Sequence, residues 1–474
     1  MSARHIPRRG WTVRVLAVAA ALTTTATMAA CGGSDSAGGS TNAPGADALK
    51  NAKGVTEVEF WHSMKGANVV ALNKIVTEFN NAHKGKIKVK PVFEGEYDDA
   101  IAKYKTSVQQ HHTPDLIQVY DIGSRFMIDS KQTVPMYKFI EKDKFDVSQI
   151  EPNIANYYRF DGKQWSMPFN TSMPLLYINV DLFKKAGLDP SKPPKNLDEI
   201  EADAKKIKKA AKSSKVTGFN AAIYGWFLEQ LLATNGDQYC DKDNGRSGLA
   251  SKALFDSADS VKVAQWWTRM VNEKAATNTG RTTDAAQQAF KSGTVGMTLE
   301  STGELRDFID ASKGKFTVAA APFPRLTGDG SSNGGTIIGG ASLWVNGVGH
   351  TDAEKRASWE FIKFASSPTI QAKWHTGTGY FPVNKAALDE PIDKAWVKQL
   401  PQFTVAVNQL HSTQPSTATA GCAMGVMPQS RQAAEEALEK TITSGDPNSA
   451  QANLTAKAKS LQKPIDDYTK AVSK

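Results

Sequence analysis

Polar and aromatic side chains follow three short segments that read as strands, and their types suit the recognition of a small polar ligand. These positions are Trp61-His62-Ser63, Glu94 to Tyr97, and Tyr120-Asp121. Hydroxyl and carboxylate groups exchange hydrogen bonds with a polar ligand, and aromatic rings can cover its carbon atoms. Ligands of open parallel sheets bind outside the carboxyl ends of the strands, so we expect these positions to lie together.

The histidines give no support for metal-dependent chemistry. We find no metal-ligand spacing between them and carboxylates, and His62 is expected to orient its neighbours. There is no Walker A motif. The sequence therefore predicts no metal, no cofactor and no catalysis, although spacing alone does not exclude a glycosidase carboxylate pair, and a secreted hydrolase is kept as the remote alternative.

The elements that must position these residues follow from hydrophobic periodicity. Residues 55–61 and 86–90 alternate like strands, residues 115–120 form a third short strand, and two segments with helical spacing lie between them. This β-α-β-α-β order predicts an open, mainly parallel sheet. A second unit begins near Met173, and 474 residues exceed one ordinary core, so we expect two lobes.

Seven motifs resemble the extracellular solute-binding proteins (family 1) of bacterial ABC importers, and within them the sn-glycerol-3-phosphate binders. The resemblance covers roughly residues 55 to 465 and rests on the following motifs: Phe60-Trp61-His62-Ser63-Met64; Gln118-Val119-Tyr120-Asp121; Pro168-Phe169-Asn170-Thr171-Ser172; Phe183-Lys184-Lys185-Ala186-Gly187-Leu188-Asp189-Pro190; Ile338-Gly339-Gly340-Ala341-Ser342-Leu343-Trp344-Val345; Trp374-His375 with Thr378-Gly379-Tyr380; and Met427-Pro428-Gln429 with Arg431.

The resemblance implies a two-lobed α/β periplasmic-binding-protein fold of the maltodextrin-binder type (type II), with a hinged cleft between the lobes. It places lobe one at residues 56–170 plus 320–347 and lobe two at 171–319 plus 348–474. The implied protein is a monomer, not an enzyme, that captures a phosphate ester and delivers it to ABC permease subunits in the membrane.

The resemblance also implies the ligand-binding residues, which are Tyr97, Asp121, Ser172, Ser301, Gly340, Tyr380 and Arg431. In the related binders, the counterparts of Tyr380 and Arg431 hold the phosphate. A carboxylate at the position of Asp121 accepts hydrogen bonds from the glycerol hydroxyls, and the backbone N–H at the position of Gly340 faces the ligand.

The residue types agree with this chemistry. Arg431 offers a rigid fork of donors to a phosphate, and tyrosine and serine hydroxyls add neutral donors. One carboxylate at the far end, Asp121, would accept the protons of a diol and repel a misplaced phosphate. Trp61, Trp226 and Trp344 could wall the carbon skeleton.

Each assignment has a plain structural alternative. Arg431 opens a predicted helix and could form a surface ion pair, and Tyr97 could belong to the core. Asp121 could cap the following turn, and Gly340 could serve packing alone. Trp61 and Trp344 could equally be core residues.

Asp121 departs from the pattern of the related binders, which carry Glu there. The shorter side chain withdraws the carboxylate by more than the tolerance of a direct hydrogen bond. The ligand could therefore be glycerol-3-phosphate or a bulkier glycerophosphodiester such as glycerophosphocholine. A sugar or oligosaccharide is the alternative ligand within the same superfamily.

The charge of the chain points to no polyanionic partner. The formal net charge is +9. Four arginines and no acids lie in residues 1–30, so the remainder is close to +5. Lysines alternate with acids elsewhere, without the aromatic-studded basic patch typical of nucleic-acid binders.

The N-terminus has the pattern of a lipoprotein leader. An arginine-rich start, an apolar stretch and Met28-Ala29-Ala30-Cys31 predict a signal peptide over 1–30 and a lipid on Cys31. Residues 31–55 then form a flexible tether. These features predict a lipid-anchored protein on the outer face of the cytoplasmic membrane. In such an oxidising compartment Cys240 and Cys422 could form a disulfide or remain two buried thiols.

Overall fold

The computed structural model describes residues 41–328 and 334–473, which lie in one compact unit, 38–474. The predicted signal peptide, Cys31 and the first part of the tether lie outside the described residues. Within those residues, no helix combines the length and the apolar character that a bilayer crossing needs.

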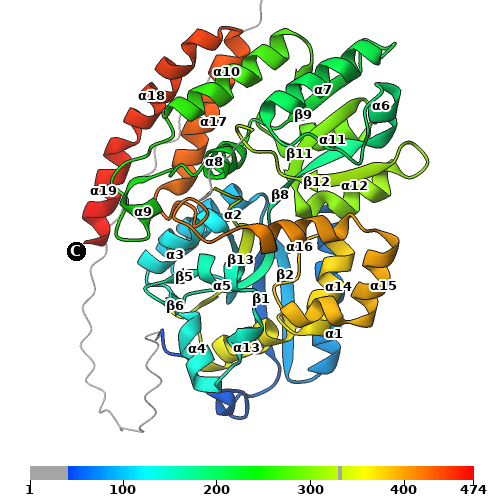
Figure 1. The fold of residues 1–474 in the computed structure, drawn as a ribbon. Helices are drawn as coiled ribbons and strands as arrows, with labels where there is room; N and C mark the ends of the chain where they lie inside the picture. The colour runs from blue at the N-terminus through cyan, green and yellow to red at the C-terminus, as the bar shows by residue number, and fades with distance from the viewer. Residues whose placement is uncertain (1–40, 329–333, 474) are drawn as a thin grey trace, which may run out of the picture. The chain divides into compact units, whose positions relative to one another are not determined.

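The first sheet has six strands in the order β2-β1-β3-β13-β4, and β7 also pairs with β13 (Figure 1). Strands β1, β2 and β3 run parallel, whereas β13 runs antiparallel to β3. We call the part of the chain built on this sheet lobe one. The strands are β1 (Thr56–His62), β2 (Ile87–Phe93), β3 (Leu116–Tyr120), β4 (Thr133–Val134), β7 (Met167–Ser172) and β13 (Gly339–Asn346).

Two helices from distant parts of the sequence cover the same face of this sheet. Phe60 of β1 lies 5.7 Å from Phe361, measured between ring centroids, and Phe361 lies 5.2 Å from Phe79. Burial of these rings stabilises the packing of α1 (Gly66–Ala82) and α13 (Asp352–Ala365) on the sheet. Other elements of this lobe are α2 (Tyr97–Gln109), α3 (Ser124–Asp129), α4 (Met136–Asp143), α5 (Pro152–Tyr157), β5 (Arg159–Phe160), β6 (Lys163–Gln164) and α14 (Pro368–Thr378).

The second sheet has five strands in the order β10-β9-β11-β8-β12. Strand β9 is parallel to β10 and β11, and β8 is antiparallel to β11 and β12. We call the part built on this sheet lobe two. The strands are β8 (Pro174–Asn179), β9 (Thr217–Ala221), β10 (Ala276–Asn278), β11 (Val295–Ser301) and β12 (Val318–Pro322).

Helices enclose the second sheet, and several of them also pack on one another. Asn196 caps the helix that begins at Leu197, because its side chain accepts a hydrogen bond from the N–H of Glu199. The helices are α6 (Val180–Lys185), α7 (Leu197–Ala210), α8 (Gly225–Thr234), α9 (Asp241–Gly245), α10 (Ala258–Asn272), α11 (Thr283–Lys291), α12 (Leu305–Ser312), α16 (Phe403–Ser412), α17 (Met427–Ser444), α18 (Ala450–Ser460) and α19 (Gln462–Val472), whereas α15 (Pro391–Gln399) packs on α14 of lobe one. Short 3-10 turns are η1 (Ala46–Leu49), η2 (Asp121–Gly123), η3 (Val147–Gln149), η4 (Thr302–Glu304), η5 (Lys385–Asp389) and η6 (Pro447–Ser449).

In the described part of the chain, three segments connect the lobes. Met173 joins β7 to β8, the segment after β12 returns to β13, and the segment between α14 and α17 carries α15 and α16. Two α/β lobes with repeated crossings confirm the predicted fold class.

The predicted lobe boundaries differ from the packing at two places. Strand β12 pairs with β8 of lobe two, although residues 320–347 were assigned to lobe one. Helices α13 and α14 pack on lobe one, although 348–474 was assigned to lobe two. Residues 352–374 have one continuous amphipathic pattern, and that pattern does not reveal which sheet receives the apolar face.

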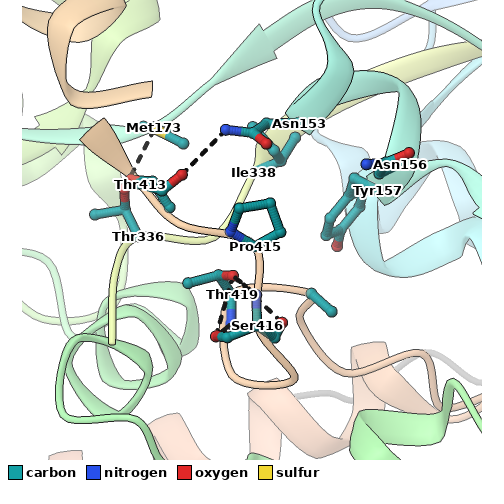
Figure 2. Close-up of a pocket in the computed structure, with 11 residues that line it drawn as sticks. Asn153, Asn156, Tyr157, Met173, Thr336, Ile338, Thr413, Pro415, Ser416 and Thr419 are labelled. Carbon is teal, nitrogen blue, oxygen red and sulfur yellow. Dashed lines mark hydrogen bonds between the residues drawn. The ribbon is translucent and has the colours of Figure 1, made fainter. Parts of the chain in front are cut away.

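A cavity of about 80 Å³ lies among the three connecting segments (Figure 2). Asn153 of α5 donates from Nδ2 to the carbonyl oxygens of Leu410, at 3.1 Å, and Thr413, at 3.2 Å. Thr336 and Thr413 approach within 3.3 Å through their hydroxyl oxygens. The two Asn153 bonds tie the connection after α16 to α5 of lobe one, and the threonine contact joins that connection to the one before β13.

A disulfide joins Cys240 and Cys422, whose Cα atoms are 5.8 Å apart and which are separated by 182 residues in the sequence. Cys240 precedes α9 and Cys422 precedes α17. The bond therefore fixes the approach of the chain to α17.

Replacing both cysteines by serine is expected to lower the free energy of unfolding by about 3–5 kcal/mol, because the unfolded chain regains the entropy of a long loop. Urea unfolding of the purified variant against the oxidised wild type measures this loss. Wild type reduced under native conditions serves as a control and should unfold like the variant. Equal urea midpoints for the variant and the oxidised wild type would contradict the expectation.

Candidate functional site

The site is organised by a buried arginine in the first turns of α17. Arg431 donates from Nη2 to Oδ2 of Asp121, at 2.6 Å. Asp121 follows β3 and begins η2, so this ion pair connects lobe two to the strand ends of lobe one. The side chains of Arg431 and Asp121 are only 3% and 5% exposed.

This contact corrects one part of the sequence interpretation. We expected Asp121 at the end of the pocket far from Arg431, where it would receive a diol, but the two side chains are hydrogen-bonded. The start of α17 packs against η2, which brings the two residues together. Asp121 is therefore a direct partner of Arg431 in this structure.

Sequence reasoning missed a second carboxylate. Glu229 accepts from Arg431 Nε at 3.0 Å and from Nη2 at 2.6 Å. Its other oxygen accepts from the backbone N–H of Cys422 at 3.3 Å, beside the disulfide. A signal was available, because Glu229 is the one charged residue in α8, whose apolar composition already predicts burial.

Burial and the mutual charges of these three groups set their pKa values. Burial raises the pKa of both Asp121 and Glu229, and the nearby Arg431 counteracts this rise. Burial alone would lower the pKa of Arg431, but the two carboxylates outweigh it and hold the pKa well above its ordinary value. The guanidinium is therefore charged, and it is shared between two carboxylates.

Several buried donors among the described residues have no hydrogen-bond partner. They include Nη1 of Arg431 and Nε1 of Trp226, at the start of α8. Buried donors are almost always paired in proteins, so each of these two indicates a place where a polar group can bind. The indole of Trp226 also lies against Gly339, where a Cβ would come within 2.4 Å of the ring.

Tyr97 and Tyr380 form the polar part of the site on the side of lobe one. Asn170 donates from Nδ2 to the hydroxyl of Tyr97 at 2.9 Å and accepts from Gln118 at 2.7 Å. The ring of Tyr97 stacks on Tyr120, with centroids 5.3 Å apart. Burial raises the pKa of Tyr97 well above its ordinary value and that of Tyr380 to about 12, so both are neutral hydroxyls.

Ser172 and Gly340 lie on neighbouring strands at the first crossing. Ser172 pairs with Gly339, and Gly340 pairs with Thr171. Gly340 has φ +81°, and a Cβ there would lie 2.0 Å from the carbonyl oxygen of Asn170. The glycine is thus required by the backbone, which is the packing role that the sequence left open.

Ser301 ends β11 and caps the turn that follows. Its Oγ accepts from the N–H of Gly303 at 3.1 Å. Two carboxylates flank it. Burial raises the pKa of Glu300 to about 7, and burial followed by the charge of Glu300 raises the pKa of Glu304 to about 8.

The predicted aromatic walls divide into three cases. Trp226 follows Gly225, which lies against Arg431, so it borders the group formed by Arg431, Asp121 and Glu229. Trp344 is 1% exposed and its Nε1 donates to Ser342, so it is a core residue, which corrects its assignment as a wall. Trp61 is partly buried. Its Nε1 donates to the exposed Glu59 at 2.6 Å, so the indole nitrogen faces the surface.

The histidines need one correction. His350, Glu354 and Asp115 come close enough to share an ion, a grouping that the sequence spacing was judged not to contain. The ring nitrogens of His350 already face Asp115 Oδ1 and Thr113 Oγ1, each at 2.9 Å. Asp115 precedes β3, whereas Asp121 follows it, so this group is at the opposite end of the strand. His62 behaves as expected: burial lowers its pKa to about 4, and its Nδ1 accepts from the N–H of Met64.

Comparison with known proteins identifies consistent relatives. The model of the bacterial extracellular solute-binding protein family matches residues 74–405. The chain is 34% identical over 399 residues to the sn-glycerol-3-phosphate-binding periplasmic protein UgpB of Yersinia enterocolitica, covering 83% of this chain and 89% of the relative.

Two solved structures share the fold. UgpB from Mycobacterium tuberculosis in complex with glycerophosphocholine superposes with a TM-score of 0.74 and 21% identity, over 87% of this chain and 99% of that chain. The GacH receptor of Streptomyces glaucescens, solved unliganded and with acarbose, superposes with a TM-score of 0.70 and 20% identity, over 87% of this chain and 99% of that chain.

Glu300 is expected to make the ligand-free protein less stable as pH rises from 5 to 8. Its pKa is higher in the folded state than in the unfolded chain, so the stabilising effect of its protonation is complete below about pH 4.5 and is lost through pH 7. Glu300→Gln should reduce the fall in unfolding free energy by roughly 1–3 kcal/mol.

Urea unfolding at several pH values measures this difference. The control is Glu78→Gln, which removes an exposed carboxylate paired with Lys373 and should leave the pH slope unchanged. Parallel slopes for wild type and Glu300→Gln would contradict the expectation.

Proposed function

This chain belongs to the bacterial extracellular solute-binding protein family, and from that premise we propose that it captures glycerol-3-phosphate or a glycerophosphodiester for an ABC importer. The relatives that match over most of the chain are named for binding sn-glycerol-3-phosphate. The proposal also covers a lipid anchor at Cys31 and a monomeric protein that acts outside the cytoplasmic membrane.

The observation that carries the ligand proposal is the unpartnered Nη1 of buried Arg431. A guanidinium nitrogen with a free N–H favours an anionic oxygen, and phosphate esters provide one. The neutral hydroxyls of Tyr97 and Tyr380, together with Ser172 and Ser301, would donate to the remaining phosphate oxygens or to the glycerol hydroxyls. No group in this set suggests a reaction, which agrees with a role in binding.

Capture requires the two lobes to approach each other around the ligand, and the structure contains contacts suited to hold them. Lys65, which follows β1, is ion-paired with Glu96 in its own lobe and with Asp284 of lobe two at 3.0 Å. Asn68 of α1 donates to the carbonyl oxygen of Gly303 at 3.2 Å. A ligand that bridges the lobes would add to these contacts, and the closed form would be the one delivered to the permease.

A saccharide is the second candidate ligand, and one observation favours it. Arg431 is already paired with two carboxylates, and carboxylates accept hydrogen bonds from the hydroxyls of a neutral sugar. The titration below therefore includes maltose, whose binding in place of both glycerol phosphates would replace the first proposal.

Isothermal titration of residues 46–474 with glycerol-3-phosphate, glycerophosphocholine, maltose and inorganic phosphate tests the ligand. We expect saturable binding of at least one glycerol phosphate. Arg431→Lys, which keeps the charge but loses the planar fork, should weaken that binding roughly 100-fold, or about 3 kcal/mol. Arg125→Lys, at a partly exposed pair with Asp129, is the matched control and should bind like wild type. Full affinity in Arg431→Lys would count against the phosphate assignment.

The lipid anchor has a separate test. Cys31→Ser removes the thiol that would be acylated, so the protein should move from the membrane fraction to the soluble secreted fraction when both forms are expressed in the same bacterium. Cys240→Ser keeps a thiol at Cys31 and should remain in the membrane fraction. Membrane association of Cys31→Ser would refute acylation at this residue.

A further inference from the structure

One buried cation, Arg431, lies between two buried carboxylates at the candidate site, and a second arginine, Arg246, is partly buried beside them. Arg431 is paired with Asp121 and Glu229, as described above. Arg246 donates from Nη1 to the carbonyl oxygen of Tyr157 at 2.9 Å and from Nε to that of Gly421 at 3.3 Å. Burial lowers the pKa of Arg246, and the negative charge of Glu229 acts against this, although no ion pair joins the two residues among the described contacts. Glu435 is a further partly buried carboxylate that the charge of Arg431 reaches.

Glu229 differs from Asp121 in how it is held. Asp121 belongs to lobe one, so opening of the lobes can separate it from Arg431. Glu229 belongs to lobe two, as Arg431 does, and its second oxygen is fixed by the N–H of Cys422. It is 1% exposed and accepts from two nitrogens of the same guanidinium. Glu229 therefore remains on Arg431 whether the lobes are open or closed.

We propose that Glu229 determines which ligand charge the site accepts, by permanently cancelling one positive charge at Arg431. The inference rests on the proposed phosphate site and deepens it. A phosphate oxygen bound to Nη1 and the Glu229 carboxylate bound to Nε and Nη2 would contact the same guanidinium, so the two negative groups would be separated only by that guanidinium. The resulting repulsion grows with the negative charge of the ligand, so it discriminates most strongly against dianionic monoesters and not at all against neutral polyols.

A purely structural role for Glu229 makes a different prediction. If the carboxylate only orients the arginine, its replacement changes the affinity for every ligand by a similar factor. If the carboxylate instead sets the net charge at Arg431, its replacement changes the affinity by a factor that grows with the negative charge of the ligand. Glu229 does not touch the ligand in this proposal, so the dependence on ligand charge is the informative measurement.

The test compares wild type with Glu229→Gln by isothermal titration at pH 7.5. The amide has nearly the same shape, but its one oxygen can accept either from the N–H of Cys422 or from Arg431 and not from both. The ligands are glycerol, which is neutral, glycerophosphoglycerol, which is monoanionic, and glycerol-3-phosphate, which is mainly dianionic. We expect an unchanged response to glycerol, about tenfold tighter binding of the diester and about hundredfold tighter binding of the monoester.

The matched control is Asp393→Asn. Asp393 is also 1% exposed and is paired with His375, whose Nδ1 lies 2.5 Å from its oxygen, on the helices α15 and α14. Removing this buried carboxylate should leave all three affinities unchanged. Should Glu229→Gln fail to fold, Glu229→Asp withdraws the carboxylate from the guanidinium and should give smaller gains in the same order of ligand charge.

The outcomes separate this inference from the proposed function. Equal affinities of wild type and variant for the esters, or an equal change for all ligands, would overturn the role of Glu229 while the phosphate site stands. If neither protein binds an ester, both proposals fall. If only the variant binds esters, the proposed ligand of the wild type is wrong and the role of Glu229 in excluding anions is supported.

Discussion

A charged guanidinium inside a protein must be paired, and the pairing of Arg431 governs the arrangement around it. Leaving it unpaired would cost several kcal/mol, so carboxylates have to reach it through the interior. One carboxylate comes from the end of β3 in lobe one and the other from α8 in lobe two. The positions of α8 and α17 are therefore linked, because moving either would separate Arg431 from Glu229, and η2 adds the second carboxylate where the lobes meet.

Glycine makes this close assembly possible at two points. At Gly225, which begins α8, a Cβ would lie 2.8 Å from Cβ of Arg431. At Gly339, which begins β13, a Cβ would lie 2.4 Å from the indole of Trp226. Side chains at either place would push α8 away from α17 or from the crossing strands, so the charge cluster depends on backbone positions that carry no charge themselves.

Local pattern predicted much of the fold, and long-range packing accounts for what it missed. Alternation located β1 and the start of β2 to within one residue, and a short apolar run located β3, because these signals are contained in a few neighbouring residues. The sheet that receives α13 could not be predicted, since an amphipathic helix shows which face is apolar and not what covers it.

The same limit applies to the site. Residue types and resemblance selected Arg431 and Asp121, and the structure brings both into one cluster. Their direct contact was not foreseen, because the distance between residues 310 positions apart depends on how the lobes meet. Glu229 had no motif around it, and only its isolation in an apolar helix distinguished it.

The cysteine pair has a consequence for how the chain matures. Three thiols permit three intramolecular pairings, and only one of them joins Cys240 to Cys422. A thioether at Cys31, as proposed, would remove one thiol before oxidation and leave a single possible bond. Oxidation would then need no reshuffling. Formation of this disulfide would also show that the segment before α17 has reached its folded position beside Cys240, because the two cysteines are 182 residues apart in the sequence.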